Sequence, residues 1–129
     1  MNERSIRSLS LSTIALARQF GIRVTAEQVE EKISRGHISS QNDLEQTFKE
    51  QGIKLQYLKP ALRTLIERSY YFPCVATLKD GTSRILISCK VNEQNIAEFQ
   101  TIDPLDPTNK VVVENETEFK SSWNGAVFL

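Results

Sequence analysis

The stretch YYFPCVATL (Tyr70–Leu78), followed by KDGT (79–82) and SRILISCKV (Ser83–Val91), decides the fold of this chain. Both flanking segments are rich in β-branched and aromatic residues, which favour extended strands. The Asp80-Gly81 pair between them is typical of a tight turn that joins two antiparallel strands. The stretch therefore predicts a β-hairpin, and with it an antiparallel sheet in the second half of the chain.

Upstream of the hairpin, apolar residues recur at helical spacing. The first predicted helix places Leu9, Leu16 and Phe20 on one stripe and ends at Gly21, a residue that suits the end of a helix. The second begins with a capping-box pattern at Thr25, in which side chains satisfy free backbone donors. The four predicted helices cover 8–20, 25 to near 36, 40–51 and 61–68.

Downstream of the hairpin, strands are predicted over 96–102 and 111–113, then a short helix over 117–123, an Asn124-Gly125 turn and a last strand over 126–129. Helices that precede an antiparallel sheet define the α+β class. Because the sequence has neither repeats nor an internal linker, residues 1–129 are expected to form a single domain. The apolar ending VFL indicates that this domain is part of a longer protein.

The composition excludes several classes of protein. The chain has 16 Lys and Arg against 16 Asp and Glu, so its formal net charge is zero. Nucleic-acid binding normally needs an excess of Lys and Arg, because phosphate neutralisation supplies much of the affinity. No apolar run approaches the ~20 residues that cross a bilayer, and the charged N-terminus is not a secretory signal. Neither a nucleic-acid partner nor direct membrane insertion is expected.

Cysteine and histidine are too few for a disulfide framework or a zinc site. Cys74 and Cys89 both lie in apolar predicted strands, where a free thiol behaves as a small hydrophobe. The single histidine, His37, lies in a predicted loop and is expected to be solvated. The sequence therefore predicts no metal site and no cofactor.

Several short motifs together resemble a known family. They are RQFGI (18–22), GIK (52–54), FPCVA (72–76), IDP (102–104) and WNG (123–125). In this order and spacing, the chain resembles the N-terminal peptidase-like domain of bacterial ABC exporters. That family contains the bacteriocin-processing cysteine peptidases and their inactive relatives on haemolysin-type exporters of type I secretion. The resemblance implies a papain-like fold, in which a helical half packs on an antiparallel sheet.

The resemblance also locates the catalytic positions of the family. The nucleophilic Cys at the start of the first helix falls on Ser8, and the Gln that stabilises the oxyanion falls on Asn2. The His falls on Ser83, or on Arg84 if the register shifts by one residue. Only the Asp that orients the histidine is retained, as Asp103.

With thiol and imidazole both replaced, Ser8 lacks the general base that would make its hydroxyl a nucleophile. The chain is therefore expected not to be an enzyme but a degenerate cysteine-peptidase domain. In the inactive relatives the His persists and stacks on an aromatic residue of the preceding strand. That aromatic position falls on Thr77.

A peptidase-like fold keeps a groove for an extended peptide even without catalysis. The resemblance thus implies a domain that binds the unfolded or partly folded export substrate, or its leader. It would lie on the cytoplasmic face of the bacterial inner membrane, next to the membrane and nucleotide-binding domains of its exporter. Aromatic side chains make good anchors for such a peptide, and the candidates are Tyr57, Tyr70, Tyr71 and Trp123.

Alternatives remain open at this point. Tyr71 and Trp123 also fit the description of core residues. A peptide could instead pair with an exposed sheet edge, which leaves no side-chain signature. At the level of function, the domain could be a structural or regulatory module that packs on the transporter without contacting substrate. A residual serine-type hydrolase that uses Ser8 is a remote alternative.

Overall fold

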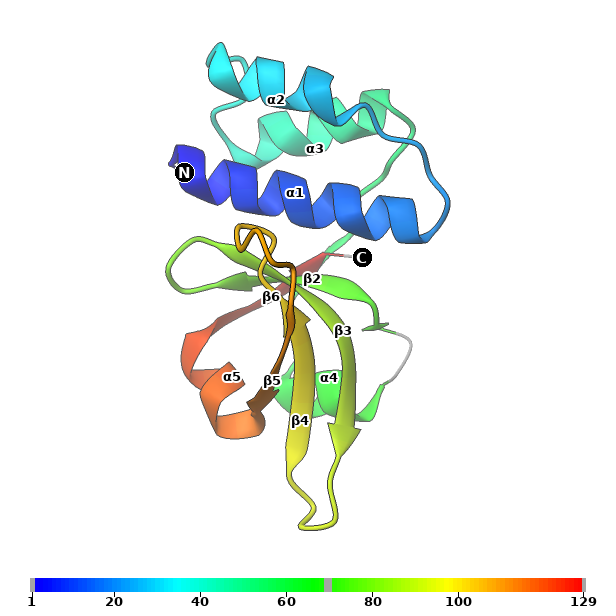
Figure 1. Cartoon of the computed structure of the whole chain (residues 1–129), viewed down its shortest axis with the longest axis vertical. Helices are drawn as coiled ribbons and strands as arrows, with labels where there is room; N and C mark the ends of the chain where they lie inside the picture. Colours follow the sequence, from blue (N-terminus) through cyan, green and yellow to red (C-terminus); the bar gives the residue numbers. More distant parts are fainter. Residues whose placement is uncertain (1, 69–70, 129) are drawn as a thin grey trace.

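The computed structural model describes residues 2–68 and 71–128 (Figure 1). Helices dominate the first half of the chain and strands the second, so the predicted α+β class is confirmed. In chain order the elements are α1 (Glu3–Gln19), α2 (Ala26–Ser34), α3 (Gln41–Glu50), β1 (Tyr57–Leu58), α4 (Leu62–Glu67), β2 (Cys74–Leu78), β3 (Ser83–Val91), β4 (Ala97–Ile102), β5 (Val111–Asn115), α5 (Glu116–Ser122) and β6 (Trp123–Phe128).

The strands form one antiparallel sheet in the order β1-β6-β2-β3-β4-β5. The predicted hairpin is present as β2 and β3. Its turn is fixed by Asp80, whose Oδ1 accepts hydrogen bonds from the backbone N–H of Thr82 at 2.9 Å and from its hydroxyl at 2.6 Å. The last strand, β6, lies between β1 and β2 and so occupies the interior of the sheet.

Helix α1 lies between the sheet and the other two N-terminal helices (Figure 1). It contacts β2 and β3 on one side and α2 and α3 on the other. Two apolar clusters cover the two faces of the sheet. The cluster on the α1 side includes Leu9, Val29, Leu44, Phe48, Val75 and Phe128. The cluster on the opposite face includes Leu65, Cys74, Leu86, Phe99, Phe119, Trp123 and Val127.

The ends of α1 differ from the prediction. The helix begins at Glu3 rather than at Ser8, because Asn2 Oδ1 accepts a hydrogen bond from Ser5 N at 2.8 Å and caps the helix. Phe20, predicted to lie on the buried stripe, is the C-cap residue and is 63% exposed. The end of the helix from Arg18 onward therefore lies outside the core.

Two other local predictions are also corrected, and two features appear that were not predicted. The Thr25 side chain makes no capping bond, and the Thr25 N–H instead donates to Gln51 Oε1. A capping box does form at Asn115 and Glu118, at the start of α5. The Asn124-Gly125 pair lies within β6, beside a shift in the register between β2 and β6. The two-residue strand β1 was not predicted.

Over the described residues, no helix is both long and apolar enough to cross a membrane. The same residues contain no group of three or more His, Cys, Asp or Glu side chains that could hold a metal ion.

Candidate functional site

Two of the four predicted catalytic positions are in direct contact. Ser83 N donates a hydrogen bond to Ser8 Oγ at 2.7 Å, and Ser8 Oγ donates to Ser83 O at 3.2 Å. Both residues are almost completely buried, at 0% and 1% exposure. Arg84, the next residue of β3, points to the opposite face of the sheet because side chains alternate along a strand. Both hydrogen bonds to Ser8 therefore use the main chain of Ser83.

Ser8 does not lie at the N-terminus of its helix. Because α1 begins at Glu3, the free backbone N–H groups of the first turn precede Ser8. The stabilisation of an anion by a helix N-terminus is confined to that first turn. The Ser8 hydroxyl instead connects the middle of α1 to the start of β3.

The other two predicted positions make local hydrogen bonds. Asn2 caps α1, as described above. Asp103 directly follows β4, where its Oδ1 accepts a hydrogen bond from Leu105 N at 3.0 Å. Among the residues that the structure describes, no hydrogen bond or ion pair joins Asp103 to Ser8 or Ser83. The β3–β4 register nevertheless places Asp103 at the end of the sheet where β3 begins.

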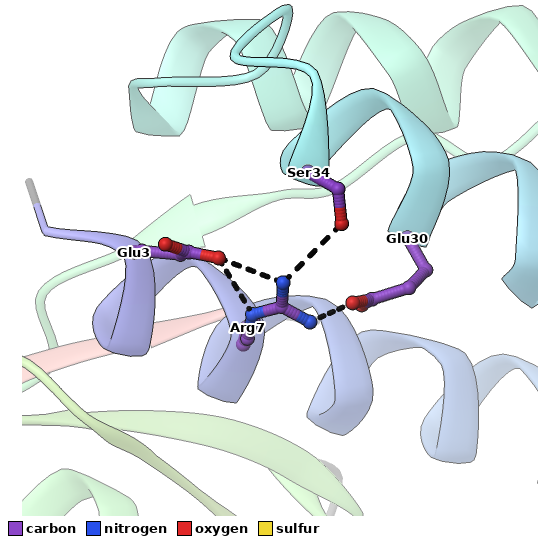
Figure 2. A network of polar contacts seen from close by, with 4 residues as sticks. All are labelled: Glu3, Arg7, Glu30 and Ser34. Carbon is purple, nitrogen blue, oxygen red and sulfur yellow. Dashed lines mark hydrogen bonds and ion pairs between the residues drawn. The ribbon is translucent and has the colours of Figure 1, made fainter.

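Arg7 precedes Ser8 in the sequence and contacts α2, on the side of α1 away from the sheet. Its guanidinium points toward α2 (Figure 2). Nη2 lies 2.7 Å from Glu3 Oε1 and 3.4 Å from Ser34 Oγ, and Nη1 pairs with Glu30. Ser8 thus connects α1 to the sheet, and Arg7 connects it to α2.

Strand β2 precedes Ser83 and pairs with the start of β3. Thr77, the position that the resemblance assigned to an aromatic residue, pairs with Ser83 across β2 and β3. The Thr77 hydroxyl donates to Asn124 Oδ1 on β6 at 2.6 Å. The two paired residues, Thr77 and Ser83, therefore both have small polar side chains.

Neither cysteine has the properties of a thiolate nucleophile. Burial raises the pKa of Cys74 to about 12. Burial, and secondarily the negative charge of Glu116, raise the pKa of Cys89 to about 11. Both thiols are therefore protonated at neutral pH, whereas the thiolate is the reactive form. The described residues place both in strands as free thiols, in agreement with the predicted structural role.

The predicted aromatic anchors have different environments. Tyr57, on β1, is 42% exposed, and its ring centroid lies 5.1 Å from that of Phe128. Tyr71 is half-buried and packs against the cluster on the far face of the sheet. Trp123 is buried, and its indole N–H donates to Ala126 O at 2.9 Å, so it is a core residue. Tyr70 lies outside the described residues.

An exposed apolar surface that the sequence did not predict lies at the end of α1. Phe20 and Ile22 flank Gly21 and are both exposed. The available signal was Gly21 itself, a helix-ending residue with a φ of +76°. Phe20 lies directly before this glycine, beyond Ala17, the last buried residue of the helix.

Neither a protein-family model nor a curated protein matches this sequence. Solved structures do match. A double glycine motif protease from an AMS/PCAT transporter, in complex with the leader peptide, has a TM-score of 0.70 at 18% identity, over 98% of this chain and 81% of that one. The N-terminal peptidase C39-like domain of a toxin secretion ATP-binding protein from Vibrio parahaemolyticus has a TM-score of 0.64 at 19% identity, over 100% and 96% of the two chains. The peptidase domain of Streptococcus mutans ComA has a TM-score of 0.56 at 19% identity, over 70% and 73%.

These similarities confirm the predicted papain-like cysteine-peptidase fold. The helical layer and the antiparallel sheet of this chain correspond to those of peptidase domains over nearly its whole length.

The expectation that the chain is not an enzyme is corrected by the same findings. It depended on the residue types at Ser8 and Ser83, yet two of the chains that share the fold are described as a protease and as a peptidase domain. The physical reason is that a hydroxyl is also a nucleophile wherever a neighbouring group accepts its proton. Replacement of a thiol by a hydroxyl is therefore insufficient ground for classing the domain as a non-enzyme.

Proposed function

We propose that this chain is the peptidase-fold domain of a secretion ABC transporter and that it binds the leader, or an unfolded part, of the exported polypeptide. The observation that carries the proposal is the match over 98% of the chain to a transporter protease solved with a leader peptide. Peptide binding needs a shaped surface and does not depend on which nucleophile is present.

Exposed apolar side chains in the first half of the chain support this function. Phe20, Ile22 and Tyr57 are large apolar side chains that remain exposed, although the domain buries two clusters elsewhere. Phe20 and Ile22 line the same groove. Adjacent exposed apolar side chains are more typical of an interaction surface than scattered ones are.

The proposal extends to the parent protein. The domain would precede the membrane-spanning segments and the nucleotide-binding domain of an exporter, on the cytoplasmic face of the inner membrane. The open reading frame downstream of residue 129 tests this part directly. A frame that encodes neither component would remove the exporter assignment.

The binding role is tested by NMR. The ¹⁵N-labelled domain is titrated with a synthetic leader peptide encoded beside its gene, and a scrambled peptide of the same composition serves as the control. Saturable amide shifts with the leader, and none with the scrambled peptide, are expected. A module that only packs on the transporter would show no shifts with either peptide. Mass spectrometry of the same mixtures, with Ser8→Ala as the matched variant, reports whether Ser8 cleaves the bound peptide.

A further inference from the structure

We propose that strand β5 pairs antiparallel with the β5 of a second copy of this chain, which joins two six-stranded sheets into one continuous sheet. The pairing surface is the free edge of the sheet at residues 110–114. The inference goes beyond the proposed function and does not depend on it, because it uses none of the exposed side chains Phe20, Ile22 and Tyr57.

β5 lies at the end of the sheet, so its backbone has a free edge. The strand is hydrogen-bonded to β4, its neighbour on the inner side. Within residues 2–68 and 71–128, no strand pairs with its outer side. The N–H and C=O groups along such an edge pair readily with a strand from another chain. β5 can therefore accept one further strand.

β5 lacks features that commonly protect an edge strand, such as short length, a bulge or a proline. The opposite edge, β1, is protected, because it has only two residues and is followed by Lys59 and Pro60. β5 has five residues, and its register with β4 is free of the shifts present between β3 and β4 and between β2 and β6. Val111 and Val113 are 53% and 52% exposed. A regular apolar edge of this kind is typical of a strand that another strand covers.

The sequence of this edge is complementary to itself. It reads KVVVE over residues 110–114. When two copies pair antiparallel about a twofold axis at Val112, Lys110 lies opposite Glu114 on both sides of the axis. Val111 likewise lies opposite Val113. Because opposite residues share a face of the sheet, the valines at 111 and 113 of both copies form one apolar group, and the ion pairs lie on the other face.

Neighbouring registers lack this complementarity. In an antiparallel ladder only every second residue directs its N–H and C=O toward a given edge. The twofold axis can therefore lie at Val111, Val112 or Val113, but not between two of them. An axis at Val111 places Lys110 opposite Val112, and an axis at Val113 places Glu114 opposite Val112. Of the three, the axis at Val112 alone pairs valine with valine and each charge with its opposite.

The charges of Lys110 and Glu114 are available for these ion pairs. Lys110 is exposed and Glu114 is half-buried. In the part of the chain that the structure describes, neither side chain takes part in a hydrogen bond or an ion pair. Hydrogen bonds from Thr108 and, less strongly, the charge of Lys110 lower the pKa of Asp106, but Lys110 and Asp106 form no ion pair. Pairing with a second copy would therefore break no existing ion pair.

Sedimentation equilibrium of the chain from about 10 µM to about 1 mM tests the pairing. A five-residue edge buries less area than a standard interface of roughly 1,600 Å². We therefore expect a weak, reversible dimer with a dissociation constant between about 10 µM and about 1 mM. Over the same concentrations, ¹⁵N spectra should show shifts of the β5 amides and none of the β1 amides. A chain that stays monomeric at about 1 mM would overturn the inference.

Charge reversal tests the register. Lys110→Glu and Glu114→Lys each place like charges opposite one another at both ends of the pairing, so each should weaken the dimer by about tenfold. This effect should shrink as salt is added. In an equimolar mixture of the two variants, the mixed dimer again has opposite charges facing each other, so it should form about as tightly as the unmodified dimer. If either residue acted only in folding, the mixture would not recover.

Matched variants control for charge and for the loss of an exposed valine. Lys54→Glu makes the same charge change at another exposed lysine and should leave association unchanged. Val113→Thr should weaken the dimer by roughly two- to fivefold, whereas Val91→Thr, at a similarly exposed valine of β3, should not. Thermal melts verify folding, and Lys110→Gln or Glu114→Gln, each with a smaller expected loss, replaces any reversal that fails to fold.

Two further results would overturn the inference. One is a mixture of the two reversal variants that associates no more tightly than either variant alone. The other is a shift of the β5 amides when the leader peptide is added at a concentration where the chain is monomeric. That shift would assign the free edge of β5 to the exported polypeptide instead of a second copy.

Discussion

The hydroxyl of Ser8 is hydrogen-bonded to both main-chain groups of Ser83, accepting from its N–H at 2.7 Å and lying 3.2 Å from its carbonyl oxygen. One buried side chain therefore satisfies the donor and the acceptor at the start of β3, a strand that lies 75 positions further along the chain. This contact joins the helical layer to the sheet at Ser8, the position to which the sequence resemblance assigned the nucleophile.

Replacement of Ser8 should therefore reduce stability more than replacement of Ser83. Ser8→Ala leaves the buried N–H of Ser83 without its partner, and an unsatisfied buried group costs about 1–3 kcal/mol. Ser83→Ala keeps both hydrogen bonds, because they use main-chain atoms of residue 83. Urea denaturation of the two variants measures the difference. Equal losses of unfolding free energy would show that the contact does not carry the effect.

Gly81 should be intolerant of a side chain for two separable reasons. Its φ is +88°, and an added Cβ would lie 2.5 Å from Ser5 Oγ of α1. Gly81→Ala is expected to cost roughly 1–3 kcal/mol from backbone strain together with this clash. Adding Ser5→Ala to Gly81→Ala should recover only the part of the lost stability that comes from the clash.

Gly125→Ala is the matched control for Gly81→Ala. Gly125 has a φ of +97°, but no atom lies within 4 Å of an added Cβ. Its cost should therefore come from the backbone alone and should not change when Ser5→Ala is added. If adding Ser5→Ala changed the stability of both glycine variants by the same amount, the proposed contact between the hairpin turn and α1 would be contradicted.

Arg7 should stabilise the packing of α1 on α2 more than an ordinary surface arginine stabilises its helix. Arg7→Ala removes contacts with Glu3, Glu30 and Ser34, whereas Arg63→Ala removes one pair within α4. Exposed pairs contribute about 0.2–1 kcal/mol each, so we expect about 1 kcal/mol for Arg7→Ala and less than half of that for Arg63→Ala. Thermal unfolding at low and high salt measures both losses, and the Arg7 effect should diminish at high salt. Identical losses would indicate that the Arg7–Glu30 pair adds nothing.

The two thiols should react slowly in the native state and in a defined order. Cys74 is buried and Cys89 half-buried, and their pKa values are raised to about 12 and about 11. An ordinary thiol has a pKa of about 8.5, so at pH 8 the thiolate fraction of Cys89 is lower by roughly a hundredfold or more. Modification by a chromogenic disulfide should therefore reach Cys89 first, and Cys74 only on unfolding.

The same pKa shifts predict how stability depends on pH. Because the folded state keeps the thiols protonated and the unfolded state does not, the stabilisation is complete below the ordinary thiol pKa and declines as pH rises toward 11. Cys74→Ala should reduce this alkaline decline. Rapid modification of Cys74 in the folded protein at pH 8 would contradict its burial.

Local sequence patterns were sufficient to predict the hairpin and most of the helices. Asp80-Gly81 specifies its turn through bonds within the turn itself, and Leu44 and Phe48 face the core as their spacing predicts. What it could not predict depends on distant partners. Tyr57–Leu58 is a strand only because β6 lies beside it, and the Thr25 N–H finds its partner in Gln51, which is 26 positions further along the chain.

The candidate site shows the same division. The resemblance assigned the nucleophile and the histidine to Ser8 and Ser83, and the structure places these two residues in contact. It could not indicate the hydrogen-bond partners of Asn2 and Asp103, which are set by backbone groups within three residues. Nor could it predict the exposure of Phe20, since the helical stripe continues unchanged to its last residue.

The interior position of β6 has a consequence for how the domain is made. Val127 belongs to one apolar cluster and Phe128 to the other, so the final strand contributes to both cores. Its pairing with β1 joins Tyr57 to Phe128 and closes a long loop, which slows folding. During synthesis from the N-terminus, α1, α2, α3 and the hairpin therefore leave the ribosome before the strand that completes both cores. The nascent chain stays exposed to chaperones and proteases until residues 123–128 have emerged.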